Sequence, residues 1–166
     1  MKVCDSKKGS GAFAIDEECT WAWVGSKDFN DELAISIGVR PYHLPYHGGT
    51  IITCNKDFNL ALMLNREIEM TSTEYYLTKM NSFLNRIGYG TTIDNNDIMW
   101  NGNKIAGSAF YQTPNSNIFY MSLCLMDHSR EIEILCGKNA KVPGYLTGIT
   151  KIEIENEVNA WLRPTI

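Results

Sequence analysis

The sequence predicts an α+β fold in which helices pack on a mixed, largely antiparallel sheet. Stretches of strand-like composition are joined by short turns, two longer segments have helical periodicity, and the order along the chain is strands, helix, strands, helix. The length of 166 residues allows one domain with its own core.

The first half of the chain is expected to contain three strands and a short helix. Strands are expected over residues 19–24, 50–54 and 58–64, the last with apolar residues at alternate positions. A helix is expected over residues 28–37, because apolar residues recur on one face and a glycine follows. Residues 39–47 contain two prolines, which indicates an irregular segment or an edge strand.

The second half is expected to consist of helices and strands of similar number. Asn101-Gly102 is the preferred pair for a two-residue hairpin turn, because both central positions of this turn need positive φ. The elements expected are, in order, a helix over 72–87, hairpin strands over 98–100 and 105–111, a turn at 114–117, a strand over 118–126 apolar enough to be buried on both faces, a short helix ending at 135, and a final helix capped by Thr150 and stopped by Pro164.

The predicted hairpin carries the residues of most chemical interest. It places Lys104 just past a tight turn and Gly107 on the returning strand. A glycine inside a strand leaves room for a ligand or another backbone to approach. A fixed cation beside open backbone is suited to a phosphate or a carboxylate. The simpler interpretation of the same residues is a surface hairpin with a solvated lysine.

These residues resemble a known motif. Asn-Asp-Ile at 96–98, a turn, and Asn-Lys-Ile-Ala-Gly-Ser-Ala at 103–109 are similar to the catalytic-lysine hairpin of the family of lipoate-protein ligases, octanoyltransferases and biotin-protein ligases. The Gly-Ser-Ala ending is closest to the lipoate ligase branch. The polar, glycine-rich start of the chain indicates an N-terminal arm at 1–18, and the resemblance implies a single catalytic domain of this family at 19–166. That domain is a shortened form, without the opening strand and helix or the C-terminal accessory domain of many ligases.

The resemblance also implies an activity like that of a lipoate-protein ligase. A lipoyl or octanoyl-type acid would be activated as an acyl-adenylate, with ATP and Mg²⁺, and then attached to a lysine of a lipoyl carrier domain. Lys104 would contact the acyl carbonyl and the adenylate phosphate, where a fixed cation stabilises growing charge. The substrate- and nucleotide-binding residues that it implies are His47, Gly48, Gly49, Thr50, Asn96, Asp97, Gly107, Ser108 and Ala109.

The segment before residue 50 departs from the family pattern. Lipoate ligases carry a run similar to Arg-Arg-x-Ser-Gly-Gly-Gly there, whereas this chain has only Gly48-Gly49, unless Arg40 is a displaced remnant of the arginine pair. In the family this segment helps to hold the acyl group and the nucleotide phosphate. Its loss favours an alternative, in which the chain is a trimmed, non-catalytic derivative that binds a protein or a small ligand. Whether the chain is an enzyme is therefore left open.

Cys136-Gly137 supports a further alternative. In octanoyltransferases of this family, a cysteine in a Cys-Gly loop pairs with the hairpin lysine and forms an acyl-thioester. Cys136 and Lys104 would then move an acyl group from an acyl carrier protein without ATP, since a nearby cation makes a thiolate available. The plain interpretation is a buried, unreactive cysteine.

Composition narrows the class of partner. A net charge of −4 argues against nucleic acid, and no apolar run is long enough to cross a membrane. Five cysteines without Cys-x2-Cys spacing, after a start without a signal-peptide pattern, are typical of reduced thiols in a cytoplasm. No metal site is expected, because His43 and His47 form only half of a zinc site.

Overall fold

Two sheets organise the protein in the computed structural model, which describes residues 11–13, 18–44, 49–65, 72–112, 114–138 and 140–162. The six-stranded sheet has the order β1-β5-β9-β8-β7-β6 with every neighbouring pair antiparallel, and the three-stranded sheet has the order β3-β2-β4. In the smaller sheet β2 is parallel to β3 and antiparallel to β4. The strands are β1 (Gly11–Phe13), β2 (Thr20–Val24), β3 (Val39–His43), β4 (Thr50–Cys54), β5 (Phe58–Asn65), β6 (Thr92–Asp94), β7 (Asp97–Trp100), β8 (Asn103–Gln112) and β9 (Ser116–Leu123).

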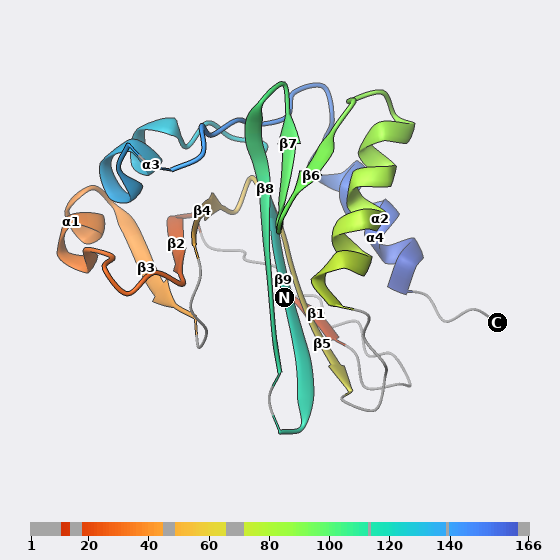
Figure 1. The fold of residues 1–166 in the computed structure, drawn as a ribbon, viewed down its shortest axis with the longest axis horizontal. Helices are drawn as coiled ribbons and strands as arrows, with labels where there is room; N and C mark the ends of the chain where they lie inside the picture. The colour runs from red at the N-terminus through yellow and green to blue at the C-terminus, as the bar shows by residue number, and fades with distance from the viewer. Residues whose placement is uncertain are drawn as a thin grey trace.

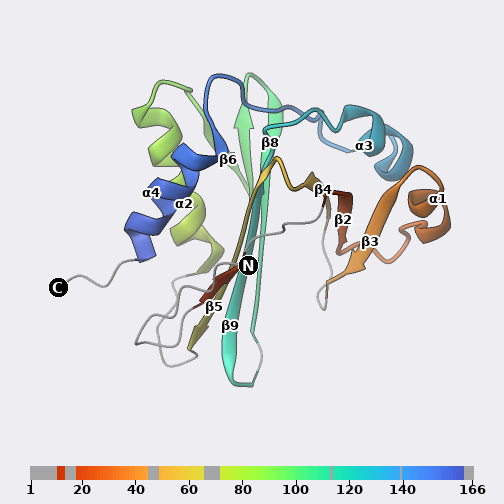
Figure 2. The same ribbon diagram turned by 180° about the vertical axis from the view of Figure 1, so that it is seen from behind.

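Helices pack on both sheets, and together they confirm the predicted α+β class. The helices are α1 (Asp31–Ser36), α2 (Ser72–Arg86), α3 (Ser129–Cys136) and α4 (Lys151–Leu162). Figures 1 and 2 show α2 and α4 on one side of the six-stranded sheet, and the smaller sheet with α1 and α3 on its other side. The long segment that follows α3 crosses the end of the large sheet near β7 and β8 before it reaches α4 (Figure 1).

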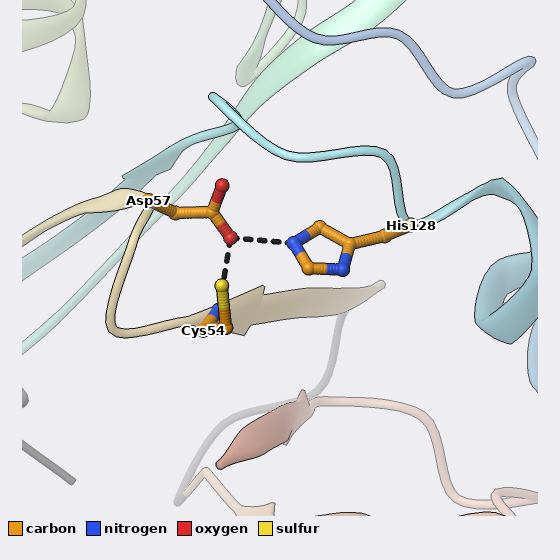
Figure 3. Close-up of side chains that lie close together, drawn as sticks. All are labelled: Cys54, Asp57 and His128. Carbon is orange, nitrogen blue, oxygen red and sulfur yellow. Dashed lines mark hydrogen bonds and ion pairs between the residues drawn. The ribbon is translucent and has the colours of Figure 1, made fainter. Parts of the chain in front are cut away.

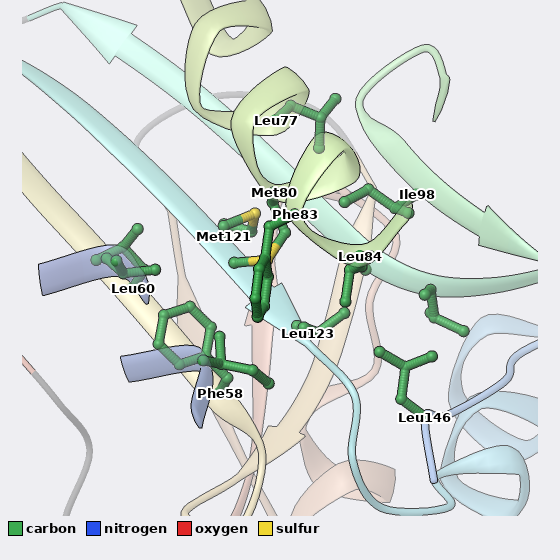
Figure 4. Close-up of a cluster of buried hydrophobic side chains, with 14 of the residues drawn as sticks. Phe58, Leu60, Leu77, Met80, Phe83, Leu84, Ile98, Met121, Leu123 and Leu146 are labelled. Atoms are coloured by element: carbon green, nitrogen blue, oxygen red, sulfur yellow. The ribbon is translucent and has the colours of Figure 1, made fainter. Parts of the chain in front are cut away.

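The larger hydrophobic core lies between the six-stranded sheet and helices α2 and α4 (Figure 4). Alternate residues of β5 and β9 point toward the helices, which is the strand periodicity of two. Full burial of one such side chain is worth about 1.5 to 3 kcal/mol. The most buried members are Leu62, Leu77, Met80, Leu84, Ile98, Ile105, Ala106, Phe119, Met121, Leu123 and Ile154.

A second, smaller core lies between the three-stranded sheet and helices α1 and α3. Ala22, Val24 and Ile52 contribute from the sheet, and Ala34 contributes from α1. The protein thus has two cores that lie on opposite sides of the large sheet.

The chain crosses from one sheet to the other at residues 55–57. Strands β4 and β5 follow each other along the chain as expected, but β4 pairs with β2 and β5 pairs with β9 and β1. The segment 39–43 is an edge strand, one of the two expectations for it. Strands β1 and β6 lie in stretches for which no strand was expected, and β1 falls within the predicted arm of residues 1–18.

The predicted hairpin is present as β7 and β8. Asn101 and Gly102 both have positive φ, as this turn requires. The register of the β7–β8 pairing shifts by one residue between Ile98, which pairs with Ala106, and Met99, which pairs with Lys104. At the other end of the chain, Thr150 accepts a hydrogen bond from the Glu153 amide while the Glu153 carboxylate accepts from the Thr150 amide, a capping box that starts α4.

Candidate functional site

The hairpin lysine shares one carboxylate with a second lysine. Asp97 on β7 receives the Lys104 ammonium at 2.9 Å on Oδ1 and the Lys141 ammonium at 2.7 Å on Oδ2. Lys141 also lies 2.8 Å from Asp94 Oδ2. Hydrogen bonds to Asp94 and Asp97 raise the pKa of Lys141, so this lysine remains protonated at neutral pH. Two ammonium groups therefore converge on one side of the β7–β8 hairpin.

A short segment, residues 141–144, fixes the position of Lys141 and is called the strap below. The Lys104 amide donates to the Val142 carbonyl at 2.8 Å, and the Gly144 amide donates to the Lys104 carbonyl at 2.8 Å. The strap therefore runs parallel to the start of β8. A Cβ atom at Gly144 would come within 2.7 Å of the Asn103 Cβ atom, so the strap lies this close because residue 144 is glycine.

Gly107 has a steric role on the returning strand. A Cβ atom there would lie 3.1 Å from Ile51 side-chain atoms and 3.2 Å from Lys104 Cε. The space that the missing side chain leaves is thus used by the protein itself, by an isoleucine of the smaller sheet and by the stem of the lysine. The sequence predicted room here for a ligand or another backbone to approach; an isoleucine side chain from the smaller sheet takes part of this space, and Gly107 also lines the cavities described next.

Two cavities meet at Lys104. The first, of about 470 Å³, lies between β4, the hairpin, α3 and the strap. The second, of about 390 Å³, lies along β8 on the side of Asn96. Both volumes are in the range of small-molecule sites. Gly49, Ile51, Asp97, Lys104, Gly107 and Lys141 line both cavities.

The two cavities differ in character away from this junction. The first has an apolar wall that includes Phe29, Ile132 and Leu135. The second is lined by the polar residues Asn95, Asn96 and Ser108 together with a few apolar ones. An apolar cavity suits an acyl chain, and a polar one suits a group with many hydrogen-bonding atoms.

Most of the residues predicted for the site lie around these cavities. Gly49, Asn96, Asp97, Gly107, Ser108 and Ala109 line the second cavity, and Thr50 and Cys136 line the first. His47 and Gly48 fall outside the described residues. Ser108 also has a structural role, since its amide and its hydroxyl both donate to the Asn96 carbonyl.

Cys136 lies at the end of α3, on the cavity that also holds Lys104. Burial raises the pKa of its thiol, while the charge of Lys104 opposes this change. The net result is a thiol that is mainly protonated at neutral pH in this conformation. The position agrees with the Cys136 hypothesis, and the direction of the pKa shift does not favour a ready nucleophile.

A cluster of three residues, the partly buried Cys54 and the buried Asp57 and His128, lies near the first cavity (Figure 3). Asp57 Oδ1 accepts hydrogen bonds from the amides of Leu125 and Met126, at 2.8 and 2.9 Å. Its Oδ2 accepts from the Cys54 amide and from His128 Nε2. Burial raises the pKa of Asp57, but these hydrogen bonds and the proximity of His128 outweigh it, so the pKa lies below its ordinary value.

This cluster has donor atoms of the kind that bind zinc, but its geometry fits a hydrogen-bonded connection better. Both Asp57 oxygens already accept amide hydrogen bonds, and His128 Nε2 points at Asp57. Burial and the Asp57 charge raise the pKa of the Cys54 thiol, which disfavours the thiolate that a metal requires. Asp57 thus ties the β4–β5 crossing to the start of α3. His43, which the sequence offered with His47 as half of a zinc site, lies outside this cluster and pairs with Asp31.

Sequence reasoning missed Lys141, Asp94 and the Asp57–His128 pair. Lys141 lies in a loop 37 positions after Lys104, and no local motif joins the two. His128 and Asp57 come from segments 71 positions apart. Cys54 and Asp57 lie three positions apart in the sequence. This spacing predicts no site by itself, because buried hydrogen-bonded carboxylates have no fixed sequence pattern.

Known proteins resemble this chain in structure but not detectably in sequence. No family model matches the chain, and none of the curated proteins matches it. Among the helices that the structure describes, none is long and apolar enough to cross a membrane.

Solved structures of lipoate-protein ligases match the fold. A bi-partite lipoate protein ligase from Thermoplasma acidophilum aligns at TM-score 0.60 and 15% identity, over 87% of this chain and 66% of that chain. Lipoate-protein ligase A bound with ATP aligns at TM-score 0.64 and 12% identity, over 86% and 66%. LipL1 of P. falciparum in complex with lipoate aligns at TM-score 0.62 and 14% identity, over 86% and 45%.

The chain spans 45% to 66% of the length of these ligases. Their identity to this chain is low, so the likeness concerns the fold. The chain has the catalytic-domain fold of the lipoate-protein ligases.

Proposed function

We propose that this protein binds a lipoyl or octanoyl-type acid and attaches it to a lysine of a lipoyl carrier domain through an acyl-adenylate. One observation carries the proposal. Lys104 lies where an apolar cavity meets a polar cavity, and its ammonium is only partly exposed. An acid with its chain in the apolar cavity would present its carboxylate to this ammonium.

Lys104 would act on charge that grows during acyl transfer. Hydrogen bonds from an ammonium group to an oxyanion strengthen as negative charge develops, which lowers the barrier. The stem of the lysine passes close to Gly107, with Cε 3.2 Å from where a Cβ atom of residue 107 would lie, and its ammonium is paired with Asp97. Asn96, held by Ser108, borders the cavity that would receive the rest of the adenylate.

The Lys104 ammonium suits the phosphate oxygens of ATP. The Asp94 and Asp97 carboxylates already receive lysine ammonium groups, so they do not fit Mg²⁺, and the ion would be held through the phosphates of the nucleotide. ATP would supply the phosphoanhydride that activates the acid. Among proteins of the same fold, solved structures are of a ligase bound with ATP, a ligase in complex with lipoate, and a ligase studied with its E2 lipoyl domain.

The test combines turnover with binding. The protein is incubated with lipoate or octanoate, ATP, Mg²⁺ and a lipoyl domain, and pyrophosphate release and the mass of the lipoyl domain are measured. We expect both signals in the wild type and their loss in Lys104→Ala. Melting temperature is followed in parallel, because a ligand at one hundred times its Kd adds about 2.7 kcal/mol of stability.

Two outcomes would contradict the ligase proposal. If acid and nucleotide raise the melting temperature but no pyrophosphate appears, the chain is a non-catalytic binding module with this fold. If no combination of acid and nucleotide raises it, the ligand is of another class, and a protein partner becomes the next candidate.

A second candidate reaction rests on Cys136, which lies on the same cavity as Lys104. In this reaction the Cys136 thiolate attacks the thioester carbonyl of an octanoyl carrier protein and releases the carrier thiol. The amine of an acceptor lysine then displaces Cys136 and forms the amide. Incubation with octanoyl carrier protein without ATP would give an octanoyl mass increase on wild-type protein and none on Cys136→Ser. Transfer that persists in Cys136→Ser would contradict it.

A further inference from the structure

We propose that Lys141 is a second anion-binding residue of the site, and that its ammonium and that of Lys104 together hold the anionic head group of the ligand. The ligand class is a carboxylate or phosphate-bearing derivative of an acid. This inference rests on the proposed function for the acyl chain. It goes beyond the hairpin motif, which contains Lys104 alone.

The backbone sets the position of Lys141 relative to Lys104. The strap forms two hydrogen bonds of 2.8 Å with the backbone of Lys104 itself. Gly144 allows this approach, because any side chain there would meet Asn103. Lys141 begins the strap, so its side chain reaches the same side of the hairpin at a fixed register rather than from a free loop.

The charge balance explains why a second lysine matters. Asp97 has a side chain only 15% exposed and lies at the junction of the cavities, so its charge would cancel that of Lys104 and leave no attraction for an anion. Counted with Asp94, the two lysines and two carboxylates sum to zero, but Asp94 is not part of the lining of either cavity, so the groups that line both cavities are two cations, Lys104 and Lys141, and one carboxylate, Asp97. The further carboxylate, Asp94, is 52% exposed, so solvent screens its charge more strongly.

The donors of both lysines leave capacity for a ligand. An ammonium group has three N–H donors. The described contacts of the Lys104 ammonium include one carboxylate oxygen. Lys141 contacts two carboxylate oxygens, and its third contact, with the Asp94 carbonyl, is long at 3.4 Å. Each lysine can thus donate to a ligand oxygen without leaving Asp97, and both line the two cavities.

The experiment compares charged and uncharged probes on three proteins. Affinities for octanoate, octanol and inorganic pyrophosphate are measured by calorimetry on wild type, Lys141→Met and Lys138→Met. Lys138 is exposed in the same loop and lines neither cavity, so it is the matched control. Circular dichroism verifies that each variant is folded.

We expect Lys141→Met to weaken the affinity for octanoate and for pyrophosphate about tenfold. This loss is at the lower end of the range for hydrogen bonds to charged groups, because the site is partly exposed. Octanol binding should not change, and Lys138→Met should match the wild type for all probes. Equal weakening of octanol would overturn the inference, since the lysine would then shape the cavity rather than bind charge. Unchanged octanoate affinity in Lys141→Met would overturn it too, and would leave the proposed function standing.

The pyrophosphate measurement separates the two proposals. If wild type binds neither octanoate nor octanol, the proposed function fails. Pyrophosphate binding that is lost in Lys141→Met would still support an anion site on the two lysines. Absent or unaltered pyrophosphate binding in that case would overturn the inference as well.

Discussion

Gly107 shows how one missing side chain positions the lysine. Ile51 from the smaller sheet and the Lys104 stem both occupy the space above it, at distances that a Cβ atom would make tight. The close approach of the two sheets and the orientation of the lysine therefore depend on the same atom being absent. Closely packed protein interiors tolerate little added volume, so residue 107 is sensitive to substitution by a larger side chain.

Gly107→Ala should lower the free energy of unfolding by about 1 kcal/mol, because added methyl groups in a packed region force neighbours to shift. Urea unfolding followed by circular dichroism measures this loss. Gly49→Ala is the matched control, since a Cβ atom there has no neighbour within 4 Å, and we expect its midpoint to equal that of the wild type. A Gly107→Ala midpoint at or above the wild-type value would contradict the steric role.

At the scale of elements, Asp57 connects segments that the sheets alone would leave apart. It lies in the crossing from β4 to β5 and accepts hydrogen bonds from residues that follow β9 and precede α3. Asp57 is fully buried and His128 nearly so. Loss of one partner of such a pair leaves an uncompensated polar group inside the protein.

Asp57→Asn should lower the free energy of unfolding by about 3 kcal/mol near neutral pH, because the amide cannot accept all of the carboxylate's hydrogen bonds. The difference from wild type should shrink in acid. The folded-state pKa of Asp57 lies below the ordinary 3.8, so its stabilisation is complete above about pH 4 and is lost as the pH falls through the lowered folded pKa.

Urea titrations between pH 7 and pH 2 measure this dependence. Asp31→Asn is the control, because Asp31 forms an exposed pair with His43 and exposed pairs contribute little. A difference between wild type and Asp57→Asn that stays constant down to pH 2 would show that the carboxylate charge is not the source of the stability.

At the scale of the whole molecule, three contacts join the part of the chain around the smaller core to the part around the larger core. The Asp57 cluster, the Ile51–Gly107 contact and the edge-to-face pair of Trp23 and Tyr120 at 4.8 Å all connect the smaller sheet to the larger one. The cavities lie between the sheets, so their shape depends on this connection.

The two cores should unfold together. Trp21 and Trp23 lie on the smaller sheet, while Trp100 and Trp161 pack against the larger core. Replacing either pair by phenylalanine leaves fluorescence that reports on one core. Within each variant, we expect the fluorescence midpoint to coincide with the circular dichroism midpoint, as in two-state unfolding. In the variant that keeps Trp21 and Trp23, a fluorescence midpoint that precedes the circular dichroism midpoint would show that the smaller sheet detaches on its own.

Local patterns in the sequence determined a large part of the fold. The Asn-Gly pair predicted the β7–β8 turn, alternating apolar residues predicted β5, and end signals predicted α2 and α4, because each depends on residues close together in the chain. The resemblance carried by Lys104 and its neighbours predicted the catalytic-domain fold that the solved ligase structures share.

Tertiary structure alone decided how the site is assembled. Nothing local to β4 and β5 shows that they belong to different sheets, because strand pairing is a contact between distant segments. For the same reason the sequence by itself named Lys104 and Asp97, while the position of Lys141 depends on a strap held by Gly144 against β8. Local chemistry thus determined which groups the hairpin carries, and long-range packing decided which groups face them.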